Sequence, residues 1–395
     1  MTTKNEALRV LQVVEPGVDG VFRHVEGLIH FLSQKRIPVD LAYSSIRGSQ
    51  ALHELTRFVE TRGGESFDMK LDRSPCFRDI PTLISLQRMI VRCRPTVIHG
   101  HSSKAGALVR ILRASGAVPP VVYTPNAYFG MGGNETPMTR FFTFIERCLG
   151  RFGTTINISP DEAAFARDRI GLSERQSRVI HNPVNPERFT PPTPEEKRVA
   201  RTRLGLPLDS LLIGSVGRLS PQKNPLMLTS AFALEARRKA GISLVHLGGG
   251  PLADEVRLLR KSLDIDQLVF CPEYMEDPRL FYHAVDALVM SSDYEAGWPI
   301  VILEALCCQL PIITTTAPGM SEIGKSGLSH CWTAAPNDIA SLADALHAWR
   351  DSLDHESKPS NHRDYVFSHF TPEICYGRVL DCYRELVQKE AKGEG

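Results

Sequence analysis

The sequence lacks a long hydrophobic run, an excess of one charge and a cysteine framework. No stretch approaches 18 consecutive apolar residues, which is close to the length that a membrane-spanning helix needs. Lysine and arginine number 46 against 45 aspartates and glutamates, a net charge of +1, so electrostatics gives no reason to expect a nucleic-acid partner. Nine cysteines, with no C-x-x-C, are too few for a disulfide scaffold, and the first residues show no signal-peptide cleavage site. We therefore predict a cytoplasmic protein.

What the sequence does contain is a regular alternation of two kinds of segment. Its 395 residues exceed what one hydrophobic core usually covers, so two domains are expected. Apolar runs rich in Val and Ile, expected as strands, are 8–15, 39–44, 96–101, 121–125, 154–159, 210–217, 243–249, 267–272, 287–292 and 311–316. Amphipathic segments, expected as helices, include 22–35, 78–93, 226–239, 251–263, 299–308, 338–353 and 370–390. This alternation predicts an α/β protein with doubly wound parallel sheets covered on both faces.

Proline marks the expected domain boundary. Segment 182–198 holds five prolines among its 17 residues, and proline cannot donate to a sheet ladder, so we predict a linker there. The expected domains are 1–185 and 186–370, followed by a C-terminal helix within 371–395. Two doubly wound domains would face each other across a cleft, with ligands beyond the carboxyl ends of the strands.

Two glycine turns in the second half precede helices. GSVGRLSPQKNP (214–225) leaves an expected strand, and its glycines would let Arg218 and Lys223 approach a ligand near a helix N-terminus, where anions are favoured. A diphosphate suits this loop, although a tight turn with two solvated cations explains it equally well. It matches neither G-x-x-x-x-G-K-[ST] nor G-x-G-x-x-G. HLGGGPLADEV (246–256) is a second such turn and a weak signal alone.

A carboxylate inside an apolar helix is more informative. Glu295 and Gly297 precede the segment VILEAL, which carries Glu304. A buried, unpaired carboxylate is costly, so Glu304 needs a hydrogen-bonding partner. The hydroxyls of a ribose would provide two bonds to it, and the alternative is a buried glutamate bonded to nearby backbone amides.

Taken in order, these motifs resemble those of glycosyltransferase family 4. They are GRL-x-x-Q-K (217–223), GGGPL (248–252), the Glu-Gly turn with E-A-L (304–306), a later G-x-x-E (319–322), the N-terminal turn VDGVFRHV (18–25) and VIHNPVNPERF (179–189). The resemblance implies the GT-B fold, with two Rossmann-like domains, an N-terminal acceptor-binding domain, a C-terminal donor-binding domain and a last helix packing back toward the first domain. It also implies a retaining, metal-independent, hexosyltransferase-type enzyme that uses a UDP or GDP sugar and no cofactor.

The resemblance assigns roles to individual residues. Arg218 and Lys223 would stabilise the charge of the departing diphosphate, Glu295 would contact the donor sugar, and Glu304 would hold the ribose. The expected catalytic residues are thus Arg218, Lys223 and Glu295. The donor side would comprise Gly20, Gly217, Arg218, Lys223, Gly249, Glu295, Gly297, the backbone amides of Ile300 and Val301, and Glu304. The acceptor or sugar side would comprise His101, Ser102, Asn126 and Tyr128.

The sequence departs from the family pattern at two positions. The family spaces its two glutamates eight positions apart. Here the residue eight positions before Glu304 is Ala296, and the nearest glutamate is Glu295. We expect one inserted residue that lets Glu295 take the role; the alternative is that the first carboxylate is absent. Asn126 stands where the family often has a histidine, and asparagine cannot shuttle protons at neutral pH.

Three further signals are less specific. His99 and His101 are expected to be hydrogen-bonding groups that face the cleft, because no carboxylate or cysteine cluster accompanies them. Asp264 and Asp266 are expected to form a solvated turn, because they fall in the loop between the expected helix 251–263 and the next strand. Segment 137–153 has an apolar stripe beside arginines, namely Phe141, Ile145, Leu149 and Phe152 beside Arg140, Arg147 and Arg151. This stripe indicates either a helix covering a sheet face or peripheral association with the cytoplasmic membrane.

The function expected from this resemblance is transfer of a sugar from a nucleotide-sugar donor to a saccharide or lipid-linked saccharide acceptor, in cell-surface polysaccharide biosynthesis. Two alternatives stay open. One is a non-catalytic GT-B module that binds a nucleotide sugar or serves as a partner subunit, which the departures at Ala296 and Asn126 motivate. The other is a nucleotide-sugar 2-epimerase, for which no acid–base pair can be assigned.

Overall fold

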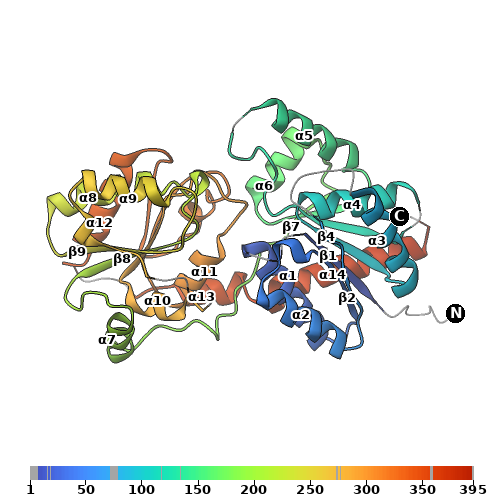
Figure 1. Ribbon diagram of the computed structural model, residues 1–395, viewed down its shortest axis with the longest axis horizontal. Coiled ribbons are helices and arrows are strands. Elements are labelled where there is room, and N and C mark those ends of the chain that lie inside the picture. The colour runs from blue at the N-terminus through green and yellow to red at the C-terminus, as the bar shows by residue number, and fades with distance from the viewer. Residues whose placement is uncertain are drawn as a thin grey trace. The chain divides into compact units, whose positions relative to one another are not determined.

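A computed structural model describes residues 8–15, 17, 19–71, 79–116, 118–133, 135–272, 275, 277–355 and 359–393. The chain forms two compact units. The first consists of Met1–Pro183 together with Pro372–Gly395, and the second of Val184–Thr371 (Figure 1). Each unit contains one parallel β-sheet with helices on both faces.

The sheet of the first unit is entirely parallel and has the order β3-β2-β1-β4-β5-β6-β7. Its strands are β1 (Val10–Val14), β2 (Val39–Tyr43), β3 (Ser66–Asp68), β4 (Val97–His101), β5 (Val121–Thr124), β6 (Thr154–Asn157) and β7 (Ser177–Val179). Because successive side chains of a strand point to opposite faces, β1 packs Val10 and Val14 into one core and Leu11 and Val13 into the other.

The helices of the first unit cover both faces of this sheet. They are α1 (Asp19–Gln34), α2 (Gln50–Thr61), α3 (Asp79–Cys93), α4 (Ser103–Ala114), α5 (Pro137–Leu149), α6 (Pro160–Phe165), continued by a π-helical turn (Ala166–Ile170), and α14 (Pro372–Ala391). Side chains of α1, α2 and α14 build one core, and those of α3 and α4 build the other. The last helix therefore belongs to the first unit, although the whole of the second unit precedes it in the sequence.

The sheet of the second unit is also entirely parallel, with the order β10-β9-β8-β11-β12-β13. Its strands are β8 (Leu211–Val216), β9 (Ile242–Leu247), β10 (Val269–Phe270), β11 (Ala287–Met290), β12 (Ile312–Thr315) and β13 (Cys331–Ala334). Its helices are α7 (Pro194–Arg203), α8 (Pro225–Arg238), α9 (Ala253–Ser262), α10 (Arg279–Ala284), α11 (Ile300–Cys307), α12 (Ile339–Ser352) and α13 (His362–His369). One core contains α10 and α11, and the other contains α8 and α12.

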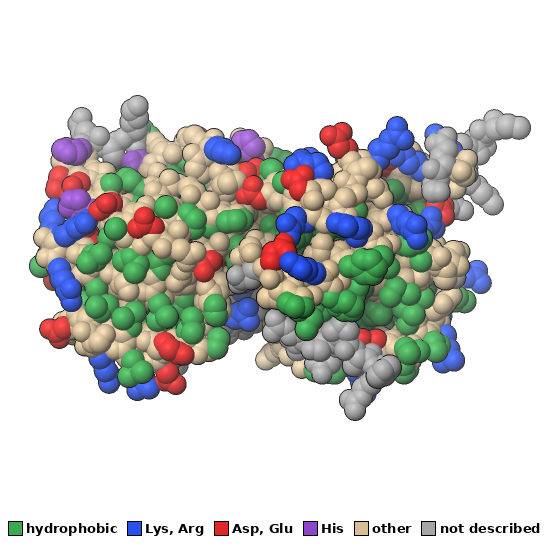
Figure 2. Space-filling view, turned by 90° about the horizontal axis from the view of Figure 1, so that it is seen from above, with side chains coloured by type: hydrophobic (Ala, Val, Ile, Leu, Met, Phe, Trp, Pro, Cys, Tyr) green, Lys and Arg blue, Asp and Glu red, His purple; other side chains and the backbone are tan. Residues whose placement is uncertain are grey.

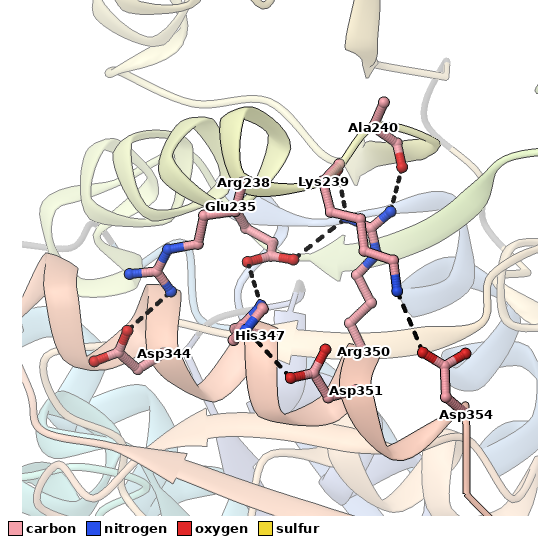
Figure 3. A network of polar contacts seen from close by, with 9 residues as sticks. All are labelled: Glu235, Arg238, Lys239, Ala240, Asp344, His347, Arg350, Asp351 and Asp354. Atoms are coloured by element: carbon pink, nitrogen blue, oxygen red, sulfur yellow. Dashed lines mark hydrogen bonds and ion pairs between the residues drawn. The ribbon is translucent and has the colours of Figure 1, made fainter.

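A buried charge network joins α8 to α12 (Figure 3). Glu235 is fully buried and pairs with Arg350 at 3.3 Å and with His347 at 3.2 Å. Arg350 also donates to the carbonyl oxygens of Lys239 and Ala240, just beyond the end of α8. These bonds satisfy backbone groups that the helix itself leaves without partners.

The linker expected over 182–198 is only partly irregular, because α7 begins inside it. Thr193 and Glu196 form a capping box, and Pro194 occupies the first turn, where its missing N–H costs nothing. The strands β3, β7 and β13 and the helices α2, α4, α6, α7, α10 and α13 were not among the expected elements. Within the described ranges, none of the helices combines the length and the apolar character that spanning a bilayer requires.

Candidate functional site

Both sheets have a point at which the strand order reverses. In the second unit this point lies between β8 and β11, and in the first between β1 and β4. Ligands of open α/β sheets bind outside the carboxyl ends of the strands at such points. The residues that follow β8 and β11, and those at the ends of β1 and β4, are therefore the first candidates.

The two glycine turns of the second unit are bonded to each other after β8 and β9. Gly217 donates its N–H to the Leu247 carbonyl at 3.1 Å, and Leu219 donates to the Gly249 carbonyl at 2.9 Å. Gly248 has a φ of +135°, and a Cβ added there would overlap the Gly217 carbonyl oxygen, so this crossing requires glycine. Next to Gly249 nothing lies within 4 Å of an added Cβ.

The two cations of the first turn have different environments. Arg218 is exposed, whereas Lys223, at the end of a short 3₁₀ helix (Pro221–Lys223), forms an ion pair with Glu295 through Nζ and Oε1. Ser292 Oγ donates to the same Glu295 oxygen at 2.7 Å. The structure thus brings the Glu295 carboxylate, which is buried, to Lys223.

The segment after β12 packs against the turn that carries Glu295 and bonds to its backbone. The Glu295 N–H donates to the Pro318 carbonyl at 2.8 Å. Gly319 has a φ of +84°, and an added Cβ would overlap the Glu295 carbonyl oxygen. The absence of a side chain at Gly319 therefore allows the segment after β12 to pack closely against the Glu295 turn.

Glu304 lies on α11 and is 4% exposed. Its Oε2 accepts a hydrogen bond from the hydroxyl of Tyr282, on α10, at 2.6 Å. Ile300 and Val301 form the first turn of α11, after Pro299. The N–H groups of a first helical turn have no intrahelical partner and favour anions. The preceding Gly297 is buried.

At the end of β4, the structure corrects one expectation. His99 and His101 are fully buried, so neither ring faces an open surface. His101 Nε2 lies 2.7 Å from Gln12 Oε1, while His99 contacts the Tyr383 hydroxyl at 2.6 Å and the Thr124 hydroxyl at 2.8 Å. Burial lowers the pKa of both imidazoles well below the ordinary value. The two rings are buried because α14 packs against the carboxyl end of β4 and places Tyr383 against His99.

The other residues expected on the acceptor side follow the ends of β4 and β5. Ser102 donates its N–H to the Thr124 carbonyl at 3.0 Å, and the half-buried Asn126 donates through Nδ2 to the same oxygen at 3.4 Å. Tyr128 is buried and stacks on Phe165, with ring centroids 5.5 Å apart. Gly20, which was expected on the donor side, lies in the first unit near the start of α1, where an added Cβ meets nothing within 4 Å.

His246 was not singled out from the sequence. It lies on β9, is buried, and lines a narrow pocket together with Lys223, Ser215 and Ser292. Burial lowers the pKa of His246 to about 4, so the imidazole is neutral at pH 7. A polar residue inside the apolar run SLVHLGG was the signal that could have identified it.

The described residues contain no group of three or more His, Cys, Asp or Glu side chains that could hold a metal ion. Asp264 follows α9 with a φ of +58°. Asp266 pairs with Arg260 at 2.8 Å. The D-x-D therefore forms part of a turn.

These two parallel-sheet units, with glycine turns and charged groups at the carboxyl ends of their strands, define an α/β protein of the GT-B class. Residues 18–188 match the family Glycosyltransferase Family 4, and residues 196–362 match Glycosyl transferases group 1. The chain belongs to glycosyltransferase family 4, and it is a glycosyltransferase.

Known proteins resemble the chain over most of its length. It is 25% identical over 317 residues to the Escherichia coli UDP-Gal:alpha-D-GlcNAc-diphosphoundecaprenol alpha-1,3-galactosyltransferase, covering 78% of this chain and 80% of that one. A glycosyltransferase from Rickettsia africae has a similar structure, with a TM-score of 0.79 at 16% identity, covering 97% of this chain and 99% of that one. HepE from Anabaena in complex with UDP-glucose has a TM-score of 0.78 at 17% identity, covering 95% and 99%.

Proposed function

We propose that this protein is a retaining, metal-independent hexosyltransferase that uses a UDP-sugar and a lipid-linked saccharide acceptor, in cell-surface polysaccharide biosynthesis. The second unit would bind the donor and the first unit the acceptor. The observation that carries the proposal is the Lys223–Glu295–Ser292 group at the carboxyl ends of β8 and β11. The galactosyltransferase that the chain resembles uses UDP-Gal and a diphosphoundecaprenol-linked sugar, and HepE binds UDP-glucose, which favours uridine.

The chemistry requires cations where the diphosphate leaves. Breaking the bond between sugar and phosphate leaves negative charge on the nucleotide, and donors aimed at that charge lower the barrier. Arg218 and Lys223 would supply the charge, and the N–H groups of Ile300 and Val301 would add hydrogen bonds. A diphosphate bound to Lys223 would replace Glu295 as its partner, and the Glu295 carboxylate would then accept hydrogen bonds from the donor sugar.

The acceptor hydroxyl must lose a proton during the transfer, and few side chains of the site can accept it. Asn126 cannot act as a base, and the buried His101 would have to leave its contact with Gln12 to reach a substrate. The proton of the acceptor hydroxyl would therefore pass to the leaving phosphate on the same face of the sugar, which retains the anomeric configuration. Glu304 would hold the ribose, with the hydroxyl of Tyr282 fixing its carboxylate.

The contact between Lys223 and Glu295 also argues against the non-catalytic alternative. The departures at Ala296 and Asn126 motivated that alternative, but the carboxylate of Glu295, next to Ala296, reaches the cation that would hold the diphosphate. One inserted residue in the turn would account for this contact, and the two charges would then serve the transfer chemistry.

A thermal-shift titration tests the proposal. UDP, GDP, ADP and their common sugar conjugates would be compared on the wild type, on Arg218→Ala/Lys223→Ala, and on Arg257→Ala/Lys261→Ala, a control that removes the same charge from α9. A ligand at 100 times its dissociation constant adds about 2.7 kcal/mol, or roughly 5–10 °C for a unit of this size. UDP compounds should shift the wild type and the control but not the site variant. No shift with any nucleotide would overturn the proposal.

Product analysis then tests the mechanism. Incubation of UDP-galactose with a synthetic GlcNAc-diphosphoryl lipid should give an α-linked product by NMR, at the same rate with and without EDTA. An inverted linkage, or loss of transfer with EDTA, would contradict the retaining, metal-independent mechanism. Isomerised free donor would instead indicate the epimerase.

We also propose that α5 associates with an anionic membrane surface. Its exposed side chains include Met138, Phe141 and Phe144 next to Arg140 and Arg147. Figure 2, seen from the side on which α5 lies in Figure 1, shows apolar and basic side chains beside one another on the first unit. A basic, apolar helix face suits a lipid surface, and a lipid-linked acceptor would be found there.

A further inference from the structure

Ala127 adopts an unusual backbone conformation on the acceptor side of the first unit. Its φ is +93°, and that of the preceding Asn126 is +52°. Asparagine tolerates the left-handed region, but alanine is sterically disfavoured there. Such conformations persist only where the surrounding structure imposes them, and they occur preferentially at functional sites. Something must therefore hold Ala127 in place.

The group that holds Ala127 is the carboxylate of Glu162. Its Oε1 accepts the Ala127 N–H at 2.7 Å, and its Oε2 accepts the Ile158 N–H at 2.6 Å. The side chain is fully buried. Both carboxylate oxygens therefore accept a backbone amide, and one of these amides belongs to the residue with the disfavoured φ.

Helix α6 positions Glu162 for this contact and adds a second one. Ser159 caps the helix by accepting the Glu162 N–H at 3.0 Å. Phe165, three residues after Glu162, stacks on Tyr128 at 5.5 Å between ring centroids and 20° between planes. The short helix thus holds segment 126–128 at two successive residues.

Burial of Glu162 is unfavourable for the fold. It raises the pKa of Glu162 to about 8, while the hydrogen bonds from Ile158 and Ala127 oppose that shift and the nearby Glu146 adds to it. An apolar residue would avoid the cost of burying this group. A buried carboxylate that fixes a strained loop is better explained by what the loop does than by stability.

We propose that Glu162 is a positioning residue, which fixes the left-handed conformation of Ala127 and so sets the placement of the half-buried Asn126 toward the acceptor. This inference rests on the proposed glycosyltransferase function. Glu162 acts only through the loop and touches no substrate itself. Loss of its hydrogen bond should let Ala127 relax to negative φ and displace the Asn126 side chain.

The test uses Glu162→Gln, Ala127→Gly and the double variant, with Glu174→Gln as a matched control at an exposed carboxylate of the same unit. A glutamine has one acceptor oxygen, so one of the two amides loses its partner. Glycine adopts positive φ without a steric cost. Transfer from UDP-galactose to a synthetic GlcNAc-diphosphoryl lipid, the thermal shift with UDP, and hydrogen exchange of the Ala127 amide would be measured for each protein.

Glu162→Gln should lower kcat/KM for the acceptor by about 10- to 100-fold, as expected for a misplaced reacting group, and speed exchange at Ala127. Its shift with UDP should stay unchanged, because Lys223 and Glu295 lie in the other unit. The double variant should regain much of the lost activity. Ala127→Gly alone gives the baseline for the double variant, and Glu174→Gln should behave like the wild type.

Three results would overturn the inference. They are wild-type transfer by Glu162→Gln, unchanged exchange at Ala127, and equal loss of activity in the single and double variants, which would indicate a purely structural role. A wild type that binds UDP but transfers no sugar would overturn the proposed function and, with it, the acceptor role of Glu162. Exchange at Ala127 would still decide whether the carboxylate holds the loop.

Discussion

At the scale of single residues, the placement of Glu295 depends on a glycine that lies outside the expected site. Gly319 has a φ of +84° and packs so closely against the backbone of the Glu295 turn that a methyl group cannot fit between them. We predict that Gly319→Ala pushes the Glu295 turn away from Lys223. Transfer activity should fall by at least about 10-fold, since a small misplacement at a reacting centre is costly. Steady-state kinetics with UDP-galactose would measure the effect.

Gly324→Ala is the matched control for this substitution. An added Cβ there would meet Thr333 at 3.5 Å, an ordinary contact, in a backbone conformation open to any residue. It should leave both activity and thermal stability close to the wild type. Equal activity of the two variants would show that the packing of Gly319 does not position Glu295.

At the scale of secondary-structure elements, the residues that α5 buries are not those of the apolar stripe that the sequence indicated. The sequence predicted a buried or membrane-facing stripe from Phe141 to Phe152. In the structure, Glu146 is buried instead, because it pairs with Arg110 at 2.9 Å and accepts from the Tyr123 hydroxyl at 3.0 Å. Phe141 and Phe144 are 55% and 62% exposed. A buried polar cluster thus turns an apolar face outward.

We predict that Phe141→Ser/Phe144→Ser weakens binding to vesicles rich in phosphatidylglycerol without lowering the melting temperature, because both side chains are largely exposed. Co-sedimentation would measure binding, with phosphatidylcholine vesicles for comparison. Ile80→Ser/Ile84→Ser on α3 removes side chains that are 60% and 50% exposed and serves as the control. If the wild type does not sediment with anionic vesicles, α5 is not a membrane-binding face.

At the scale of the whole molecule, each unit contains a buried imidazole that resists protonation. Burial lowers the pKa of His24, in the first unit, and of His246, in the second, to about 4. A group with a lowered pKa in the folded state favours folding above its unfolded pKa, and this contribution is lost as the pH falls through the folded pKa. We predict that acid destabilises both units between about pH 6.5 and 4, by roughly 3 kcal/mol for each imidazole.

Urea unfolding at several pH values would check this prediction. His24→Phe and His246→Leu should each flatten the pH dependence, whereas His355→Gln, at an exposed position, should not. The pH dependence of the Glu162 contribution to stability has the opposite sign. Its pKa is raised to about 8, so its contribution to the free energy of unfolding falls as the pH rises from about 4.5 to 8. A free energy of unfolding that stays constant from pH 7 to 4 in every variant would contradict the prediction.

The sequence by itself determined the architecture, because alternating apolar runs and amphipathic segments can bury their faces only as helices on parallel sheets. It did not reveal β3, β7 and β13, which lie at the edges of the two sheets. Their side chains are mostly only half-buried, so these segments lack the continuous apolar run that marks a strand covered on both faces. Its resemblance to the family also singled out Arg218, Lys223, Glu295 and Glu304.

Only the tertiary structure decided which of these residues meet. Lys223 and Glu295 are 72 residues apart, and Ala127 and Glu162 are 35 apart. Such pairs form because the strand order places β8 beside β11 and β5 beside β6, which a linear pattern does not state. The partner of Glu304 likewise became known only when the fold placed Tyr282 on the neighbouring helix. Charge burial and hydrogen bonding depend on these neighbours in space, so the chemistry of each side chain is a property of the folded chain.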